Sequence, residues 1–163
     1  MFTGLVQATG EVIAIDKKIQ GGCVLTIKSP LFKSVILGES IAVNGCCLTV
    51  SEFKNTEAKF DLLEETLRLT NLGDLQIGGL VNLEPSLKPT DRMGGHFVTG
   101  HIDGTGNISH WGLDGADWRL DIEVGPELAR YIVKKGCIAI DGMSLTVADI
   151  LPHGIRIWII PHT

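Results

Sequence analysis

The amino-acid sequence predicts an all-β protein built from two tandem antiparallel barrels. The first observation is an internal duplication: residues 41–50 (IAVNGCCLTV) return as residues 138–147 (IAIDGMSLTV), and Thr3-Gly4 returns as Thr99-Gly100 at nearly the same spacing. Repeated stretches at a fixed spacing indicate a repeated structural unit. The second observation is that short segments rich in Val, Ile, Leu and Thr alternate with glycine turns, which is typical of strands. About six such segments in each copy favour a small closed barrel in each half.

In the first copy, local signals predict each element. Ser29-Pro30 places an N-cap before a proline at the first helical position and predicts a short helix over 31–36. Asn44-Gly45 is a strong hairpin dipeptide. Gly10 inside the first strand indicates a bend. The expected strands are 5–15, 23–28, the two arms of the 41–50 hairpin, 59–63 and 80–84, with a helical turn at 65–71.

The second copy repeats this order after a linker at 88–95 that is rich in Pro, Gly and polar residues. We expect strands at 97–108, 117–124 and 155–160, a helix from Pro126 to Val133, and the 138–147 hairpin. The resulting domains are 1–92 and 93–163. Nothing in the second copy corresponds to 67–86, so we expect its barrel to be truncated and to lack its last strand.

Composition excludes several classes of protein. The net charge is -5 and Lys and Arg do not cluster, which argues against binding nucleic acid or an anionic membrane. No apolar run approaches the ~20 residues that span a bilayer, and the N-terminus lacks the features of a signal peptide. The four cysteines show no C-x-x-C spacing, and Cys46 and Cys47 should point to opposite faces of a strand. Reduced thiols in a cytoplasmic protein are expected.

Reactive residue types differ between the copies at matched positions, while the Gly, Leu, Thr and Val positions are kept. Cys47 matches Ser144, Leu5 matches His101, and Gln7 matches Asp103. A strand cysteine is most often a buried small hydrophobe, and a Ser-Leu-Thr run usually serves cross-strand hydrogen bonding. The pattern of differences nevertheless favours a paired small-molecule site with Ser144, His101 and Cys47 as its chemical groups.

A metal site is not expected. His96 and His101 are an odd number of residues apart, so they would face opposite sides of a strand, and no third ligand has a suitable spacing. The chain also has no phosphate loop, dinucleotide fingerprint or nucleophile elbow. We therefore expect no cofactor.

Motifs along the whole chain resemble those of the riboflavin synthase alpha-chain family, which is built from lumazine-binding repeats. They are MFTG at 1–4, VNGCCLTV at 43–50, ETL at 65–67, VNLE at 81–84, GGH at 94–96, GHI at 100–102 and IDGMSLTV at 140–147. The resemblance implies two six-stranded Greek-key barrels and a C-terminal helix that gathers three chains into a homotrimer. It implies dismutation of two molecules of 6,7-dimethyl-8-ribityllumazine, by four-carbon transfer, to riboflavin and 5-amino-6-ribitylaminouracil. It implies no metal or redox cofactor, and it allows association with lumazine synthase.

The resemblance also assigns site residues, with one lumazine in each barrel and the working site between barrels of neighbouring chains. Its substrate-binding residues in the first barrel are Gly4, Leu5, Val6, Cys47, Leu48, Thr49, Asp61, Leu62, Leu63, Glu64, Glu65 and Thr66. Those in the second barrel are Gly100, His101, Ile102, Lys135, Ser144, Leu145, Thr146, Ile159, Ile160, Pro161, His162 and Thr163. Proton handling and positioning are expected from Ser144, His101, Cys47 and Phe2, with Asp141 and Ser40 in support.

Two alternatives stay open. One is a lumazine- or flavin-binding antenna protein of the same fold that does not turn its ligand over, although such a relative would be expected to lose Ser144, Thr146 and His101. The other is a purely structural β-barrel protein. The chain departs from the family in lacking the second copy's last strand, with its acidic residue, and the helix after it. Truncation of a longer chain or a shortened relative would each explain this departure.

Overall fold

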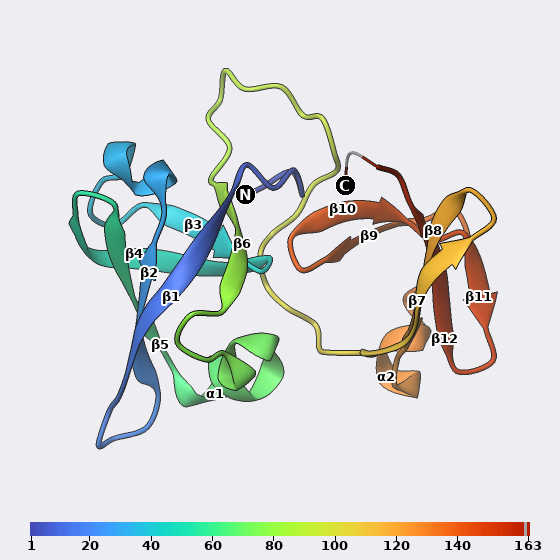
Figure 1. Cartoon of the computed structure of the whole chain (residues 1–163), viewed down its shortest axis with the longest axis horizontal. Coiled ribbons are helices and arrows are strands. Elements are labelled where there is room, and N and C mark those ends of the chain that lie inside the picture. Colours follow the sequence, from blue (N-terminus) through green and yellow to red (C-terminus); the bar gives the residue numbers. More distant parts are fainter. Residues whose placement is uncertain (162) are drawn as a thin grey trace.

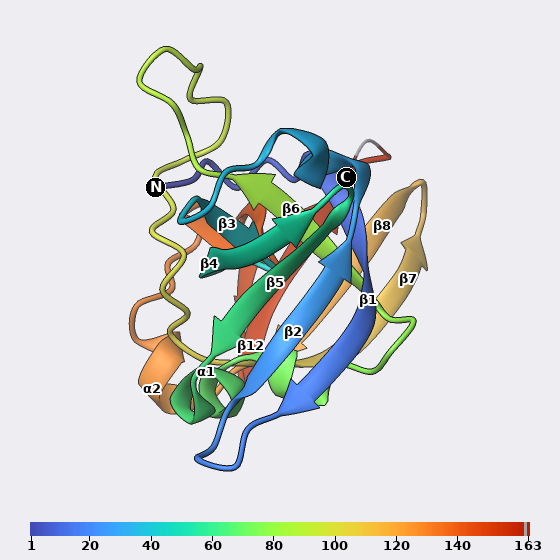
Figure 2. The ribbon, with the colours of Figure 1, turned by 90° about the vertical axis from the view of Figure 1, so that its left-hand side faces the viewer.

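The first half of the molecule is a closed six-stranded antiparallel barrel. A computed structural model describes residues 1–161 and 163 and shows two halves side by side (Figure 1). The strands of the first half are β1 (Ala8–Lys17), β2 (Cys23–Lys28), β3 (Ser40–Val43), β4 (Cys46–Lys54), β5 (Glu57–Leu62) and β6 (Leu80–Pro85). They follow the order β1-β2-β5-β4-β3-β6 around the barrel, as Figure 2 shows from the first half's side. This is the predicted Greek-key order.

Strand β6 closes this barrel because it pairs with two neighbours. Gly10 of β1 is opposite Val81, and Val43 of β3 is opposite Leu83. Alternate side chains of the six strands point inward, and Val12, Ile41 and Leu83 are fully buried. The short helices are η1 (Pro30–Ser34), α1 (Glu64–Leu69) and η2 (Asn71–Asp74). They add Phe32, Leu67 and Leu72 to the same apolar core.

The second half repeats this plan with its barrel open. Its elements are β7 (Asn107–Asp114), β8 (Asp117–Glu123), α2 (Pro126–Ala129), β9 (Cys137–Ile140), β10 (Met143–Thr146), β11 (Asp149–Leu151) and β12 (Gly154–Ile159). They form a four-stranded sheet β11-β12-β8-β7 and a separate hairpin β9–β10. Among the residues that the structure describes, no strand takes the place of β6. The edges of β7 and β9 therefore stay open, and the predicted incomplete second barrel is confirmed.

Several predicted boundaries are wrong, and sheet pairing explains the largest errors. The expected strand over 97–108 begins only at Asn107, with an isolated bridge between Val98 and Phe2. In the first copy, β6 pairs with residues 8–11, whereas no strand in the described part of the chain offers such a partner to residues 99–106. The first strand starts at Ala8 rather than Leu5, and the residues up to Gly4 bond to the second half instead. The expected helix over 31–36 is a 3-10 turn, and the one expected to reach Val133 ends at Ala129.

Both predicted hairpin dipeptides form tight turns with left-handed backbone angles. Asn44 and Gly45 have φ values of 45° and 81°, and Asp141 and Gly142 have 48° and 82°. Positive φ at both central residues matches the right-handed twist of a two-residue hairpin. The two tips lie back to back, since a Cβ atom added to Gly45 would come 2.8 Å from the Gly142 nitrogen. The two halves therefore touch through their matching turns.

None of the helices in the described part of the chain has the length and apolar character needed to cross a membrane.

A buried ion cluster joins two strands of the second half. The Asp121 carboxylate of β8 is 4% exposed and accepts hydrogen bonds from the Arg156 guanidinium of β12, at 2.8 and 2.9 Å. Arg119 Nε donates to both carboxylate oxygens, at 3.1 and 3.0 Å. The bonds from Arg156 and then from Arg119 hold the pKa of the Asp121 carboxyl well below its ordinary value of 3.8. The carboxylate form is therefore favoured in the folded second half.

We expect the second half to lose stability in acid through Asp121. Because the folded pKa is lowered, the contribution of this carboxylate is complete above pH 3.8 and declines as the pH falls below that value. Asp121→Asn should lower the melting temperature at pH 7 by about 5 °C or more and reduce its acid sensitivity. Tryptophan fluorescence follows the unfolding of the second half selectively, since Trp111, Trp118 and Trp158 all lie there. Equal melting temperatures for the variant and the parent at pH 7 would contradict the expectation.

The open edges give a second prediction. Backbone amides of β7 and β9 that face no partner strand should exchange hydrogen much faster than those of β1 and β3, which β6 protects. Hydrogen exchange read by mass spectrometry, with the mass of the chain in solution measured in parallel, tests this. Slow exchange in all four strands would mean that another strand covers the open edges.

Candidate functional site

Two extended segments carry the contacts between the halves. The first arm is residues 2–6 and the second arm is the matching residues 98–102. Phe2 donates to the Val98 carbonyl at 2.8 Å, and Val98 donates back to Phe2 at 3.1 Å. Phe2 is fully buried in a small cluster with Ala42 and Val98, against which Cys47 packs. Since Phe2 and Val98 are equivalent positions of the repeat, the arms pair about a local two-fold relation.

Each arm lies on the hairpin of the other copy. The Gly4 carbonyl oxygen accepts a hydrogen bond from the Ser144 amide at 2.7 Å, and the Gly100 carbonyl accepts one from the Cys47 amide at 2.8 Å. Both glycines have positive φ, and a Cβ atom on either would lie 2.6–2.7 Å from the facing side chain. Only glycine permits this close approach of arm and strand.

The exchange of arms corrects the expected grouping of the site segments. Residues 4–6 were expected with Cys47–Thr49, and residues 100–102 with Ser144–Thr146; this grouping is wrong. The first arm lies beside Ser144, whereas the second arm lies beside Cys47 and adds Ile102 to the core of the first half. Each arm crosses from its own half to the other one, so it contacts the copy to which it does not belong in sequence.

The first cluster centres on a serine–histidine pair. Ser144 Oγ lies 2.7 Å from Nδ1 of His96, and both residues are partly buried. The His96 amide donates to the Thr3 carbonyl at 3.0 Å. A Cβ atom on Gly95 would lie 2.0 Å from that oxygen, so the preceding glycine is needed to bring the imidazole to the serine. This distance permits direct proton exchange between the two side chains.

His96 belongs to the candidate site, and no role was assigned to it from the sequence. It was considered as half of a metal pair with His101, which was not expected, and as part of the GGH motif at 94–96 without a role of its own. The two glycines before it, Gly94-Gly95, were the available signal, because they let the chain pass close to another strand. His101 lies on the exposed second arm, where its amide donates to Thr99 Oγ1 at 3.3 Å. The structure thus places His101 near Cys47 rather than near Ser144.

The second cluster contains Cys47 on the outer face of β4. As predicted, its neighbour Cys46 points the other way, into the core, and is 7% exposed. Burial raises the pKa of the Cys46 thiol to about 11, with a further contribution from Cys47, so Cys46 remains a neutral thiol. Cys47 is partly exposed beneath the second arm. Of the two thiols, only Cys47 can meet a ligand.

Polar groups extend this outer face along the barrel. Ser40 and Thr49 are opposite each other on β3 and β4. Asp61 of β5 is paired with Lys18, and hydrogen bonds from Lys18 and then Ser51 lower the pKa of its carboxyl. Residues 63–66 run from β5 into α1, and Leu63 is exposed. Leu48, Leu62 and Leu145 are core side chains, so they can offer a ligand only their backbone.

The remaining predicted residues of the second half are spread more widely. Ile159, Ile160, Pro161 and Thr163 line a hollow of about 290 Å³ together with the stacked pair Trp111 and Trp118. Thr146 is exposed on β10. Lys135 lies at the opposite end of β9 from the hairpin tip, and its amide donates to Val147 at 2.8 Å, so it joins neither cluster. His162 lies outside the described residues.

Asp141 occupies the hairpin tip rather than the cluster around Ser144. Its carboxylate accepts from Nδ2 of Asn71 in the first half at 2.9 Å. Removal of water by the neighbouring tip raises the pKa of this carboxyl, and the bond from Asn71 opposes that effect. Asp141 therefore contacts the first half and not Ser144 itself.

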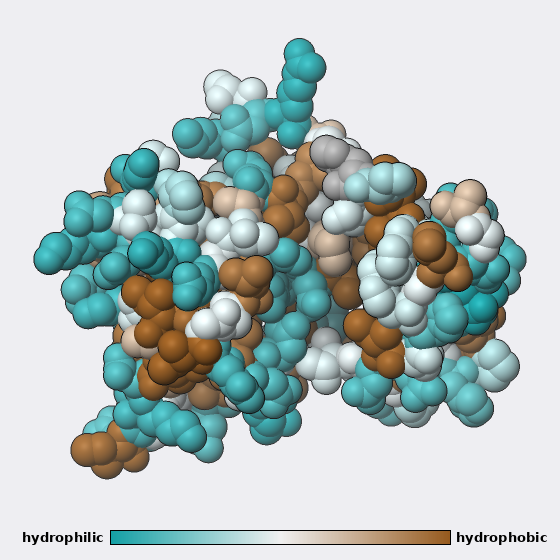
Figure 3. All heavy atoms as spheres, in the orientation of Figure 1, coloured by the Kyte–Doolittle hydropathy of each residue, from teal (hydrophilic) through white to brown (hydrophobic). Residues whose placement is uncertain are grey.

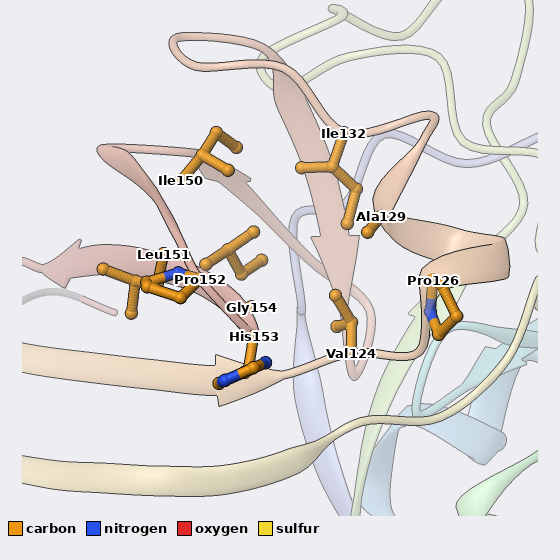
Figure 4. Close-up of a pocket in the computed structure, with 10 residues that line it drawn as sticks. Val124, Pro126, Ala129, Ile132, Ile150, Leu151, Pro152, His153 and Gly154 are labelled. Carbon is orange, nitrogen blue, oxygen red and sulfur yellow. The ribbon is translucent and has the colours of Figure 1, made fainter.

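Apolar hollows elsewhere do not contain the predicted residues. The pocket in Figure 4 lies between α2 and the β11–β12 turn, has a volume of about 370 Å³, and is lined by apolar side chains with His153. Figure 3 shows further hydrophobic residues, in brown, along the margin between the two halves. Among residues 1–161 and 163, no three His, Cys, Asp or Glu side chains gather as metal ligands. The polar clusters beneath the two arms are therefore the candidate site.

Comparison with known proteins shows the family of the chain. A family model described as the lumazine binding domain matches residues 3–86 and 99–163. The chain is 43% identical to the riboflavin synthase of Actinobacillus pleuropneumoniae over 164 residues, which is 100% of this chain and 76% of that protein. It is 42% identical to the riboflavin synthase of Bacillus subtilis (strain 168), with the same coverage.

Solved structures show the same fold. LumP complexed with riboflavin superimposes with a TM-score of 0.88 at 28% identity, covering 97% of this chain and 86% of that one. LumP complexed with 6,7-dimethyl-8-(1'-D-ribityl) lumazine gives a TM-score of 0.85 at 28% identity, covering 97% and 85%. The duplicated barrels, the family model and the two relatives agree, and the chain belongs to the riboflavin synthase family of lumazine-binding transferases.

Proposed function

We propose that this chain catalyses the dismutation of two molecules of 6,7-dimethyl-8-ribityllumazine. One molecule gives a four-carbon unit to the other, so the products are riboflavin and 5-amino-6-ribitylaminouracil. The second molecule gains the four-carbon unit, with its electrons, that the first molecule loses. The reaction therefore needs no external oxidant or reductant. The observation that carries the proposal is the pair of equivalent arm-and-hairpin clusters, one of which holds the Ser144–His96 pair.

The two clusters suit a reaction between two copies of one ligand. Backbone groups of the arms and the hydroxyls of Thr49 and Thr146 would bind the polar edge and ribityl chain of each lumazine. Holding two rings in fixed positions replaces a bimolecular encounter by an oriented one. We further propose that Cys47 and His101 complete the first-barrel cluster, that Phe2 and Ser40 support it, and that the working site lies between neighbouring chains of a homotrimer.

The Ser144–His96 pair would supply the proton transfer. The donor lumazine must lose a proton from a ring-adjacent methyl group, and the acceptor must be attacked at the neighbouring ring carbon. His96 Nδ1 can take the proton of Ser144 Oγ, or return it, across the 2.7 Å that separates them. An imidazole nitrogen can accept a proton as a general base and return it as a general acid. The reaction is proposed to take place in the cytoplasm, without metal or cofactor.

Binding without turnover is the second candidate. The structural likeness to LumP, which was solved with lumazine and with riboflavin, favours it. Both functions require the ligand clusters, and only catalysis requires proton transfer at Ser144. Product analysis after incubation with 6,7-dimethyl-8-ribityllumazine separates the two functions.

We expect the protein, within its full natural chain, to form riboflavin and 5-amino-6-ribitylaminouracil in equal amounts. Chromatography with fluorescence detection measures both products, and the same rate is expected after treatment with EDTA. Lumazine bound without any riboflavin formed would favour the binding protein. Loss of turnover with EDTA would contradict the absence of a metal.

Removing either member of the Ser144–His96 pair should lower the rate far more than the stability. Ser144→Ala and His96→Ala should each reduce kcat by roughly 10²–10⁴-fold, whereas loss of one partly buried hydrogen bond costs only about 1 kcal/mol of unfolding free energy. Ser109→Ala and His153→Ala in the same half serve as matched controls and should leave kcat unchanged. Parallel losses of kcat and melting temperature in both site variants would favour a structural role for the pair.

A further inference from the structure

The hairpin that carries Ser144 belongs to no larger sheet. Strands β9 and β10 form a two-stranded sheet of their own, and within the described residues no third strand pairs with them. Met143 and Leu145 pack inward on the core of the second half, whereas Ser144 faces outward. In Figure 1 the hairpin extends from the second half toward β6 of the first. Backbone hydrogen bonds to the four-stranded sheet begin only at Ala148, whose amide donates to the Arg156 carbonyl at 2.8 Å, so they anchor the base of the hairpin and not its tip.

Three asparagines of the first half converge on the tip of this hairpin. Asn82 of β6 donates through Nδ2 to the Asp141 carbonyl oxygen at 2.9 Å, and Asn71 of η2 donates to the Asp141 carboxylate at 2.9 Å. Asn44 contacts both of these residues. Its Oδ1 accepts from the backbone amide of Asn82 at 2.8 Å, and its Nδ2 donates to Asn71 Oδ1 at 3.4 Å. The tip is thus bound at both its backbone and its side chain.

This contact determines where Ser144 lies. The hairpin is held at its tip by Asn71 and Asn82 and at Ser144 by the Gly4 carbonyl. The Gly45–Gly142 contact leaves no room for the tip to move toward the first half. A rotation of the hairpin about its inner, apolar face would carry the Ser144 hydroxyl away from His96. The two bonds to Asp141 oppose that rotation.

We propose that Asn82 and Asn71 are positioning residues for the reaction. They hold the Asp141 tip so that the Ser144 hydroxyl stays within hydrogen-bond distance of the His96 imidazole. The inference rests on the proposed function, because it assigns its effect to the same proton-transfer pair. It adds two residues that the motifs around Ser144 do not contain, from elements distant in the sequence.

Kinetics of single variants test the proposal first. Asn82→Ala and Asn71→Ala should each lower kcat by about 10-fold or more, because displacement of a reacting group by a fraction of an ångström to 1 Å costs up to 10²-fold. KM should change by less than about 3-fold, since neither residue belongs to the proposed ligand clusters. Asn107→Ala is the matched control, at the exposed start of β7 and with no side-chain hydrogen bond among the described residues. A rise in KM with unchanged kcat would overturn the proposal.

A double-mutant cycle then asks whether the effect acts through the pair. In a His96→Ala background, Asn82→Ala should cost little further activity, because the geometry that Asn82 protects is already gone. A full, additive loss in the double variant would overturn the proposal. If Asn82→Ala does not fold, Asn71→Ala replaces it in the cycle, since η2 lies outside the barrel's strands.

A measurement without turnover distinguishes this proposal from the proposed function. The ¹⁵N NMR signal of the His96 imidazole reports its hydrogen bond, and Ser144→Ala provides the reference for its loss. Asn82→Ala should move the His96 signal toward that of Ser144→Ala. An unchanged His96 signal in a folded Asn82→Ala protein would overturn the positioning role. Absence of riboflavin formation by the parent chain would overturn the proposed function and leave this measurement valid.

Discussion

A buried carboxylate holds the first arm in place, and the contacts of this arm with the second half depend on it. Glu84 at the end of β6 is 3% exposed and accepts hydrogen bonds from the Thr3 amide and hydroxyl, both at 2.6 Å, and from the Gly4 amide at 3.0 Å. Three donors offset the cost of removing the carboxylate from water. With the amides held by Glu84, the carbonyls of Thr3 and Gly4 are available to His96 and Ser144. The closing strand of the first barrel thus helps to place the Ser144–His96 pair of the other half.

The two halves therefore repeat the same arrangement of arm and hairpin, but different hydrogen bonds hold these segments in each half. The first arm is held by Glu84, whereas in the described residues the only side-chain hydrogen bond of the second arm is the local one from the His101 amide to Thr99 Oγ1. The first hairpin belongs to a closed barrel, and the second hairpin relies on Asn71 and Asn82 across the contact. The copy that holds the serine–histidine pair is thus the one whose geometry depends most on its neighbour.

Much of this fold could be predicted from the sequence, because its turns and strand alternation are determined by residues close together in the chain. The duplication, the hairpins at Asn44-Gly45 and Asp141-Gly142, and the opposite facing of Cys46 and Cys47 follow from spacing, turn preferences and strand alternation. The strand starts at Leu5 and Phe97 were predicted wrongly, because strand assignment depends on a partner that is distant in sequence.

The candidate site was predicted less well for a related reason. Both copies carry similar arms and hairpins, so the sequence is equally compatible with each arm lying on its own hairpin or on the other one. Only the structure distinguishes these two arrangements. His96 was missed because its partner Ser144 comes from another element, and only the glycines before it indicated a close approach.

The exchange of arms has a consequence for how such a duplicated gene can diverge. Residues 4 and 144 are in contact, as are residues 47 and 100, although each pair joins different copies. A substitution at one of these contacts is therefore expected to need compensation in the other copy. We expect covariation between the copies at the arms and within each copy in its barrel core. Recombination that replaced a single repeat would bring together an arm and a hairpin with no shared history, even if both barrels were intact.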